Sequence, residues 1–228
     1  MPQSGAHPIT ARPFLLSLAL SLAPLAANAH PHVFIDAGLE MTYADGNLQQ
    51  VQVEWAYDAF YSLLIIEDLG LDPDGDGNLT EDEMTRLQGF DADWEPGFDG
   101  RLFLTAQSQP VAMGPGTDFT ARYQDGQLIS THIRTLEEPL AAGIPLTIQV
   151  YDPEYYVQFS MPDAPQIAGR APCRMEQQTG DPAAAAKAYD AAVEAALADD
   201  ESAEAEMLAV DIGNVGADQV RITCGVKG

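Results

Sequence analysis

Apolar and polar residues alternate along several segments of this chain, which is the pattern of β-strands that bury one face. Pairs of such segments flank residues that favour tight turns, such as Asp45-Gly46-Asn47 and Asp125-Gly126, and each pair predicts an antiparallel hairpin. The pairs are residues 33–43 with 48–55, 119–123 with 127–135, and 146–151 with 155–161. Shorter strands are predicted over residues 101–105, with 111–113 as a partner, and over residues 220–224.

Three other segments have the spacing and the end signals of helices. Residues 57–69 carry apolar residues at helical spacing, namely Phe60, Leu63, Leu64, Ile66 and Leu69. A capping-box sequence before residues 81–88 predicts a short second helix. Asp181-Pro182 begins an alanine-rich C-terminal helix over residues 183–197. The whole pattern predicts an α+β fold that is mainly antiparallel β and sandwich-like, with the first two helices inserted at about residues 57–89.

Between the first two predicted helices lies a sequence, residues 72–83, with the ligand pattern of an EF-hand calcium loop. Oxygen donors alternate along it, and Gly77 stands where the backbone must turn sharply. The predicted Ca²⁺ ligands are Asp72, Asp74, Asp76, Asn78, Thr80 and Glu83. EF-hands usually pair, so a lone loop predicts a structural or weakly sensing site with a Kd of about 10⁻⁴–10⁻³ M. The alternative is an acidic surface turn, because Asp-Gly pairs form turns readily.

The start of the chain, residues 1–29, has the features of a cleaved export signal. Arg12 supplies a positive charge, residues 14–27 are apolar, and Ala27-Asn28-Ala29 is a small-x-small cleavage sequence. The apolar stretch is too short for a membrane span, although a retained anchor is the alternative. We therefore predict a signal peptide over residues 1–29, followed by a single exported domain over residues 30–228.

The chain is strongly acidic, with 35 Asp and Glu against 10 Lys and Arg and a formal net charge of −25. Loss of Arg12 with the signal would make the charge of the processed chain −26. This charge argues against nucleic-acid binding, which needs a basic surface, and against direct binding to anionic lipid. It favours the attraction of cations, although much of it is also expected of an acidic surface that serves solubility alone.

The two cysteines, Cys173 and Cys224, predict one disulfide, because an exported chain reaches an oxidising compartment. Such a bond would join the C-terminal strand to the body of the domain. A thiolate metal site is the alternative, but no histidine lies near either cysteine in the sequence.

Cleavage after Ala29 would place His30 first and His32 third in the processed chain. The α-amine and imidazole of His30, together with the imidazole of His32, are nitrogen donors that Zn²⁺, Ni²⁺, Co²⁺ or Cu²⁺ prefer. Pro31 has no amide hydrogen, which excludes the amino-terminal copper and nickel site that uses deprotonated amides at positions two and three. The alternative is a frayed terminus whose histidines bind nothing.

The remaining histidine of the processed chain, His132, shares one face of a predicted strand with Ser130 and Arg134. We expect this face to be polar, which makes His132 either a third metal ligand or a solvated side chain.

The sequence contains no set of residues that matches a catalytic motif. It lacks the G-x-S-x-G, H-E-x-x-H and phosphate-loop patterns, and its carboxylates have no spacing typical of a hydrolase. An enzymatic function is therefore not expected.

Several sequence elements are similar to those of a bacterial periplasmic family labelled domain of unknown function 1007. They are His30-Pro31-His32-Val33-Phe34-Ile35-Asp36-Ala37, Trp55-Ala56-Tyr57-Asp58 with Phe60, the loop at Asp72, and Val150-Tyr151-Asp152-Pro153-Glu154-Tyr155-Tyr156-Val157. The resemblance implies a periplasmic component of an uncharacterised transport system, whose partner is a membrane permease of nickel/cobalt type. The resemblance extends from His30 to about Met161, and residues 182–206 do not match the family pattern.

These observations favour a periplasmic metal-binding accessory protein that is stabilised by Ca²⁺ and handles a transition metal for such a permease. The alternative is a calcium-binding envelope interaction protein with no transition-metal role. A solute receptor of an importer fits less well, because such receptors are built from βαβ repeats and none is visible in the sequence.

Overall fold

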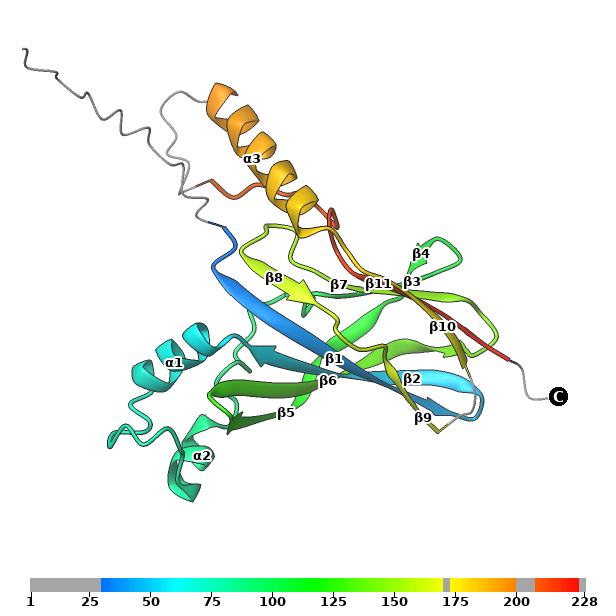
Figure 1. Ribbon diagram of the computed structural model, residues 1–228. Coiled ribbons are helices and arrows are strands. Elements are labelled where there is room, and N and C mark those ends of the chain that lie inside the picture. Colours follow the sequence, from blue (N-terminus) through cyan, green and yellow to red (C-terminus); the bar gives the residue numbers. More distant parts are fainter. Residues whose placement is uncertain (1–29, 170–172, 200–207, 226–228) are drawn as a thin grey trace, which may run out of the picture.

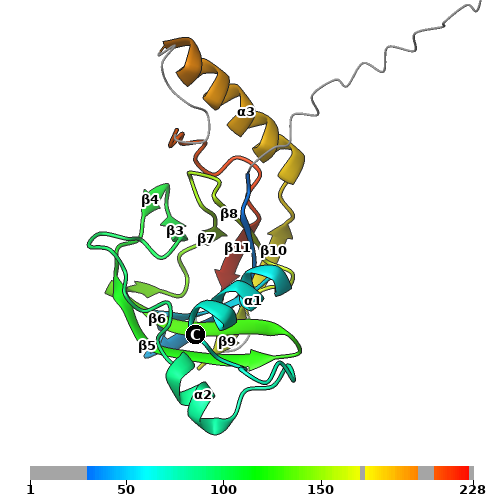
Figure 2. The same ribbon diagram turned by 90° about the vertical axis from the view of Figure 1, so that its left-hand side faces the viewer.

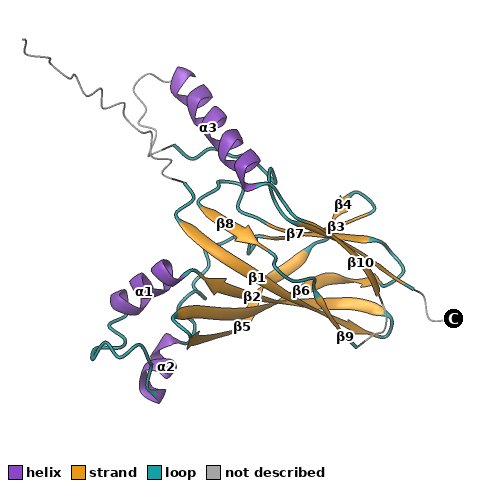
Figure 3. Cartoon of the chain, in the orientation of Figure 1, coloured by secondary structure: helices purple, strands orange, loops and turns teal. Residues whose placement is uncertain are grey.

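The computed structural model describes residues 30–169, 173–199 and 208–225. The predicted signal peptide, residues 1–29, lies outside these residues. Two β-sheets form the body of the described chain, and three helices lie around them (Figures 1 and 3).

The larger sheet contains the first two predicted hairpins. Its strand order is β5-β6-β2-β1-β8, and β9 also pairs with β1. The strands are β1 (Val33–Ala44), β2 (Asn47–Tyr57), β5 (Met113–Gln124), β6 (Gln127–Ala141), β8 (Val157–Ser160) and β9 (Gln166–Ala168). β1 and β2 pair antiparallel around Asp45 and Gly46, whose positive φ angles of 50° and 81° suit a tight hairpin turn. β5 and β6 also pair antiparallel, so both of these predicted hairpins are confirmed.

The smaller sheet is antiparallel and includes the C-terminal strand. Its order is β10-β11-β7-β3-β4. The strands are β3 (Leu102–Ala106), β4 (Gln109–Pro110), β7 (Leu146–Val150), β10 (Cys173–Gln178) and β11 (Gln219–Cys224). Cys173 and Cys224 stand opposite one another on β10 and β11 and form the predicted disulfide.

The third predicted hairpin is wrong. β7 pairs with β3 and β11 in the smaller sheet, whereas β8 lies parallel to β1 in the larger one. The turn at Asp152-Pro153-Glu154 therefore carries the chain from one sheet to the other. The alternating pattern identified both strands because each buries one face, but it contains no information about the partner strand. The predicted partner of β3, residues 111–113, is right only at Val111, whose N–H donates to the carbonyl of Leu104; β4 supplies the other pairs, and Met113 opens β5.

The inward side chains of the two sheets form one buried apolar cluster. Val51 and Val53 of β2 are fully buried, and so are Ile148 of β7 and Val220 of β11. Alternate residues along each strand point into this shared core, as the sequence pattern requires. The predicted α+β fold, mainly antiparallel and sandwich-like, is confirmed.

Helices α1 (Ala59–Asp68) and α2 (Glu81–Leu87) follow β2 and lie beside β6 and β5 of the larger sheet (Figure 2). The alanine-rich helix α3 (Pro182–Asp199) stands apart from them and packs in a second, smaller apolar cluster. The buried members of that cluster are Tyr155, Ala185, Tyr189 and Val210. Within the described residues, no helix combines the length and the apolar composition needed to cross a membrane.

Candidate functional site

A capping side chain stands at the start of each of the helices α1 and α2. Asp58 caps α1 by accepting the backbone N–H groups of Phe60 and Tyr61, both at 2.9 Å. Its second oxygen accepts the N–H of Phe34 at 3.0 Å, which ties the helix to β1. At the start of the second helix, Thr80 and Glu83 form the predicted capping box of α2.

The predicted calcium loop gathers three of its carboxylates. Asp72, Asp74 and Asp76 each offer an oxygen, and these oxygens lie within 4.8 Å of one another. Asp72 also accepts the backbone N–H groups of Asp76 and Gly77, both at 3.0 Å, so the loop folds around its first residue. Gly77 has a φ of 79°, which is the left-handed conformation that glycine adopts without strain. Three like charges held this close repel one another, and a bound cation would relieve the repulsion.

The other predicted calcium ligands are engaged with the loop itself. Glu83 accepts the N–H and the hydroxyl of Thr80 at 2.8 and 2.7 Å, and the N–H of Asp72 at 3.1 Å. The backbone N–H and hydroxyl of Thr80 hold the pKa of the Glu83 carboxyl below its ordinary value. The side-chain amide of Asn78 donates to Asp76. Glu83 thus joins the beginning of the loop to its end, at the position where an EF-hand glutamate closes the ligand shell.

The structure brings His30 and His32 together at one end of the molecule. Their ring centroids are 4.5 Å apart, and the ring of Tyr156 lies 4.7 Å from that of His32. Burial lowers the pKa of the His30 imidazole, and the neighbouring His32 lowers it further, whereas the carboxylate of Asp152 opposes the shift. The neutral form of histidine, which is the form that binds metal ions, is therefore favoured at His30.

A residue that the sequence did not identify, Tyr189 of α3, completes this group. Its ring stacks on that of His30 with centroids 4.5 Å apart, and its hydroxyl lies 3.1 Å from His30 Nδ1. A signal was present in the sequence, because Tyr189 is the one aromatic residue of an otherwise alanine-rich helix. The contact itself joins distant parts of the chain, which local patterns do not reveal.

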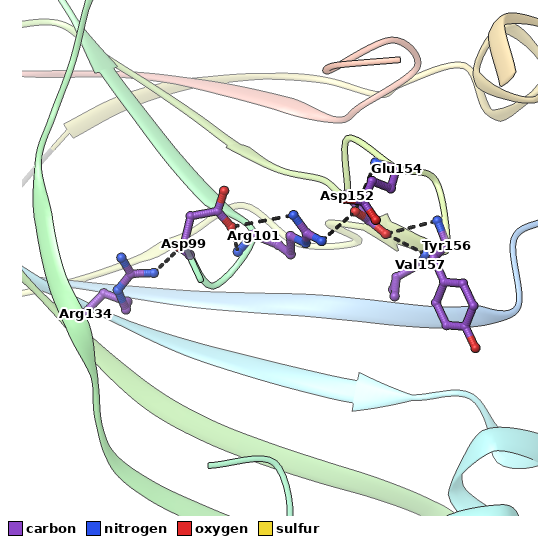
Figure 4. Close-up of polar contacts among 7 residues, drawn as sticks. All are labelled: Asp99, Arg101, Arg134, Asp152, Glu154, Tyr156 and Val157. Atoms are coloured by element: carbon purple, nitrogen blue, oxygen red, sulfur yellow. Dashed lines mark hydrogen bonds and ion pairs between the residues drawn. The ribbon is translucent and has the colours of Figure 1, made fainter. Parts of the chain in front are cut away.

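A buried carboxylate, that of Asp152, holds the crossover turn (Figure 4). Asp152 accepts the backbone N–H groups of Glu154, Tyr156 and Val157 at 3.0–3.1 Å. It also forms an ion pair with Arg101 at 3.0 Å, although its own side chain is only 2% exposed. Because three backbone donors and a guanidinium converge on one carboxylate, Asp152 fixes the path of the turn. That path places Tyr156 against His32.

The polar contacts continue from Arg101 toward the centre of the larger sheet (Figure 4). Asp99 lies 3.9 Å from Arg101, and its backbone carbonyl accepts a hydrogen bond from the buried Arg134. These contacts connect the loop before β3 to β6, and they position Arg101 to meet Asp152.

The expectation that His132 lies on a polar face is wrong. Ser130, His132 and Arg134 do share a face of β6, but it is the inner face, and His132 is fully buried. The rings of Trp55 and Trp94 each lie 4.8 Å from its imidazole. Burial, followed by the Arg134 cation, lowers the pKa of His132 from 6.5 to about 3. Within the described part of the chain, its ring nitrogens have no hydrogen-bond partner, and it does not join His30 and His32 in a cluster of potential ligands.

The misassignment of His132 has a physical reason. Loop residues that follow α2, Trp94 in particular, cover this stretch of β6 and exclude water from it. A polar side chain in a strand predicts exposure only where nothing packs on that face, and the covering segment lies far away in sequence.

The comparisons agree with the sequence resemblance. No curated protein matches this chain. The family model described as "Protein of unknown function (DUF1007)" matches residues 15–224, which include the histidine pair, the acidic loop and the crossover turn. Since the match covers nearly the whole sequence, the chain belongs to this family.

Proposed function

We propose that this protein is an exported accessory protein that binds a transition-metal ion at His30 and His32 and is stabilised by Ca²⁺. The observation that carries the proposal is the pair of imidazoles, 4.5 Å apart, at the start of the described chain. Zn²⁺, Ni²⁺, Co²⁺ and Cu²⁺ all favour such nitrogen donors.

The surroundings of His30 favour Nε2 as its ligand atom. Tyr189 lies within hydrogen-bond distance of Nδ1, and a ligating histidine commonly donates its other ring N–H to such a partner. An ion shared by the α-amine and the imidazole of one histidine must use Nδ1, because Nε2 points away from the backbone. Binding through the α-amine would therefore compete with Tyr189. We assign the ring nitrogens of His30 and His32 as the ligands, with water or a partner's side chain filling the other positions.

The acidic loop would bind the calcium ion. Its three clustered aspartates supply charge, and the backbone carbonyl of Asn78, with Thr80 and Glu83, supplies the other oxygens of an EF-hand shell. Bound Ca²⁺ would remove the mutual repulsion of Asp72, Asp74 and Asp76 and hold α1 and α2 on the larger sheet.

The disulfide between Cys173 and Cys224 supports a location in an oxidising compartment. The features of residues 1–29 and the family resemblance favour the periplasm. The same resemblance favours a membrane permease of nickel/cobalt type as the partner that delivers or receives the ion.

The test is metal titration of the processed protein, after mass spectrometry has established its first residue. Zn²⁺, Ni²⁺ and Cu²⁺ are each titrated into the natural protein and into a His30→Ala/His32→Ala variant, with Ca²⁺ present throughout. We expect the variant to bind at least about tenfold more weakly. His132→Leu, which removes a buried histidine that has no place in the site, is the matched control and should bind normally.

Equal binding by the natural protein and the double variant would refute the transition-metal role. It would favour the other candidate, a calcium-binding envelope protein that acts through its surface. Elemental analysis of protein purified from the periplasm would then show which ion the protein carries in the cell.

A further inference from the structure

The described part of the chain exposes six large apolar side chains, and five of them belong to three neighbouring segments. They are Phe34 at 48% exposure, Phe60 at 68%, Leu63 at 49%, Leu64 at 44% and Tyr156 at 51%, whereas the sixth, Val215, lies elsewhere in the sequence. Isolated exposed apolar residues are ordinary, but a group of this kind marks an interaction site. We call these five residues the apolar face.

Backbone contacts bring the three segments that carry the apolar face side by side. The backbone N–H of Phe34 donates to the carboxylate of Asp58, and the backbone carbonyl of Phe34 accepts the N–H of Asp58. Phe34 therefore lies beside the first turn of α1. Phe60 belongs to that turn. On the other side of Phe34, the carbonyl of Tyr156 accepts the N–H of His32. The start of β1 therefore lies between the crossover turn on one side and the first turn of α1 on the other.

Helix α1 is apolar on two sides, and the fold uses only one of them. Ile65 and Ile66 point inward and pack on the core. Phe60, Leu63 and Leu64 occupy the opposite side at the i, i+3 and i+4 positions, and they are all exposed. A helix that needed only to pack on its own sheet would carry polar residues there.

A pocket of about 310 Å³ opens between α1 and the crossover turn. Half of its twelve lining residues are aromatic, and these are Trp55, Tyr57, Tyr61, Phe98, Tyr156 and Phe159. A hollow of this size accepts one bulky apolar side chain, and such buried anchors supply most of the binding energy of protein interfaces.

The charge around the apolar face selects its partner. The segments that form it, residues 30–36, 58–68 and 151–157, contain six carboxylates and no Lys or Arg. One of the six, Asp152, is paired with Arg101. The other five are Asp36, Asp58, Glu67, Asp68 and Glu154. This charge repels an anionic membrane surface and attracts a basic protein surface. A second copy of this acidic chain would be repelled as well.

We infer that the apolar face binds a partner protein that presents a bulky apolar anchor side chain flanked by Lys or Arg. The anchor enters the pocket beside Tyr61, and the basic residues meet the surrounding carboxylates. This interaction goes beyond the proposed metal site and does not require it, since none of the five residues of the apolar face is a proposed metal ligand.

The test selects random peptides, displayed on phage, against the processed protein in calcium buffer free of transition metals. The natural protein is compared with a Phe60→Gln/Leu64→Gln variant, in which two exposed side chains change. The control is Val215→Gln, which removes the exposed apolar residue outside the apolar face. We expect the enriched peptides to combine Phe, Trp or Leu with Lys or Arg. They should bind the double variant at least about tenfold more weakly and bind the control as they bind the natural protein.

Three results would overturn the inference. Enriched peptides that bind the double variant equally well would show that the apolar face is not the site, and peptides without Lys or Arg would refute the charge argument. The third result is that the natural protein self-associates, or binds phosphatidylglycerol vesicles, and that the double variant loses this property. Self-association would assign the apolar face to a second copy, and vesicle binding would assign it to lipid. Because the selection excludes transition metals, failure of the metal titration leaves its result unchanged.

Discussion

The hydroxyl of Tyr189 lies 3.1 Å from Nδ1 of His30, although the two residues stand near opposite ends of the sequence. The contact gives helix α3 a role beyond packing in the smaller apolar cluster, because it brings a polar side chain to one of the two proposed metal ligands. If Tyr189 accepts the Nδ1–H, the His30 ring is held in one tautomer with Nε2 free.

Replacement of Tyr189 by Phe tests this arrangement. The variant keeps the stacked ring but loses the hydroxyl, so we expect Zn²⁺ to bind about tenfold more weakly. The ring ¹⁵N shifts of His30 should also change from a single tautomer toward a mixture. Tyr155→Phe is the control, since Tyr155 belongs to the same cluster but does not contact His30 through its hydroxyl. Tighter binding in Tyr189→Phe would instead show that the ion uses Nδ1 and the α-amine.

Asp152 provides a prediction about stability. Asp152→Asn removes the negative charge that pairs with Arg101 and replaces one of the two acceptor oxygens by an NH2 group, which cannot accept a hydrogen bond. We expect the free energy of unfolding in urea to fall by about 3–5 kcal/mol. Asp163→Asn, an exposed aspartate in the following loop, should change it very little. A loss below about 1 kcal/mol for Asp152→Asn would mean that the crossover turn is held by other contacts.

Local patterns in the sequence were sufficient to predict the elements whose partners are close in the chain. The hairpins around Asp45 and Asp125 are examples, because the turn residues and the alternating strands lie side by side in sequence. The capping box of α2 was predicted for the same reason. Strand β8 shows where such patterns fail. Its partner β1 lies far earlier in the sequence, and the turn before β8 resembles that of a hairpin.

The candidate site divides in the same way. The order of oxygen donors in the loop at Asp72, and the spacing of His30 and His32, were visible as motifs. The contribution of Tyr189 and the burial of His132 were not visible, because both depend on contacts with segments that are distant in the sequence.

Calcium should stabilise the natural protein measurably. At 10 mM Ca²⁺ and a Kd of about 10⁻⁴–10⁻³ M, binding contributes about 1.4–2.7 kcal/mol to the free energy of unfolding. Each kcal/mol corresponds to a rise in Tm of about 2–4 °C. Glu83→Gln should lower Tm in calcium and abolish the calcium-dependent rise, because one charged oxygen ligand is lost. Glu81→Gln, an exposed neighbour in the same helix, should retain the rise. A rise that persists in Glu83→Gln would argue against an EF-hand shell.

The disulfide should contribute substantially to stability. It closes a loop with a sequence separation of 51 residues, for which the chain-entropy model gives about 4 kcal/mol. A Cys173→Ala/Cys224→Ala variant should therefore unfold at lower urea concentration, and dithiothreitol should destabilise the natural protein but not the variant. Identical unfolding curves with and without dithiothreitol would show that the pairing of β10 with β11 is sufficient without the bond.

The buried imidazole of His132 should make stability depend on pH. Its pKa in the folded protein is about 3, below the ordinary 6.5, so between these values the unfolded chain binds a proton that the folded chain excludes. The free energy of unfolding therefore falls as the pH falls through this interval, and the stabilising contribution of the neutral His132 is fully present only above pH 6.5.

Carboxylates titrate in the same range, so the effect of His132 is measured as a difference from His132→Leu, whose core position is apolar and does not titrate. Between pH 7 and pH 5 the natural protein should lose about 2 kcal/mol relative to this variant in urea unfolding. Parallel pH profiles for the two proteins would show that His132 accepts a proton inside the folded core.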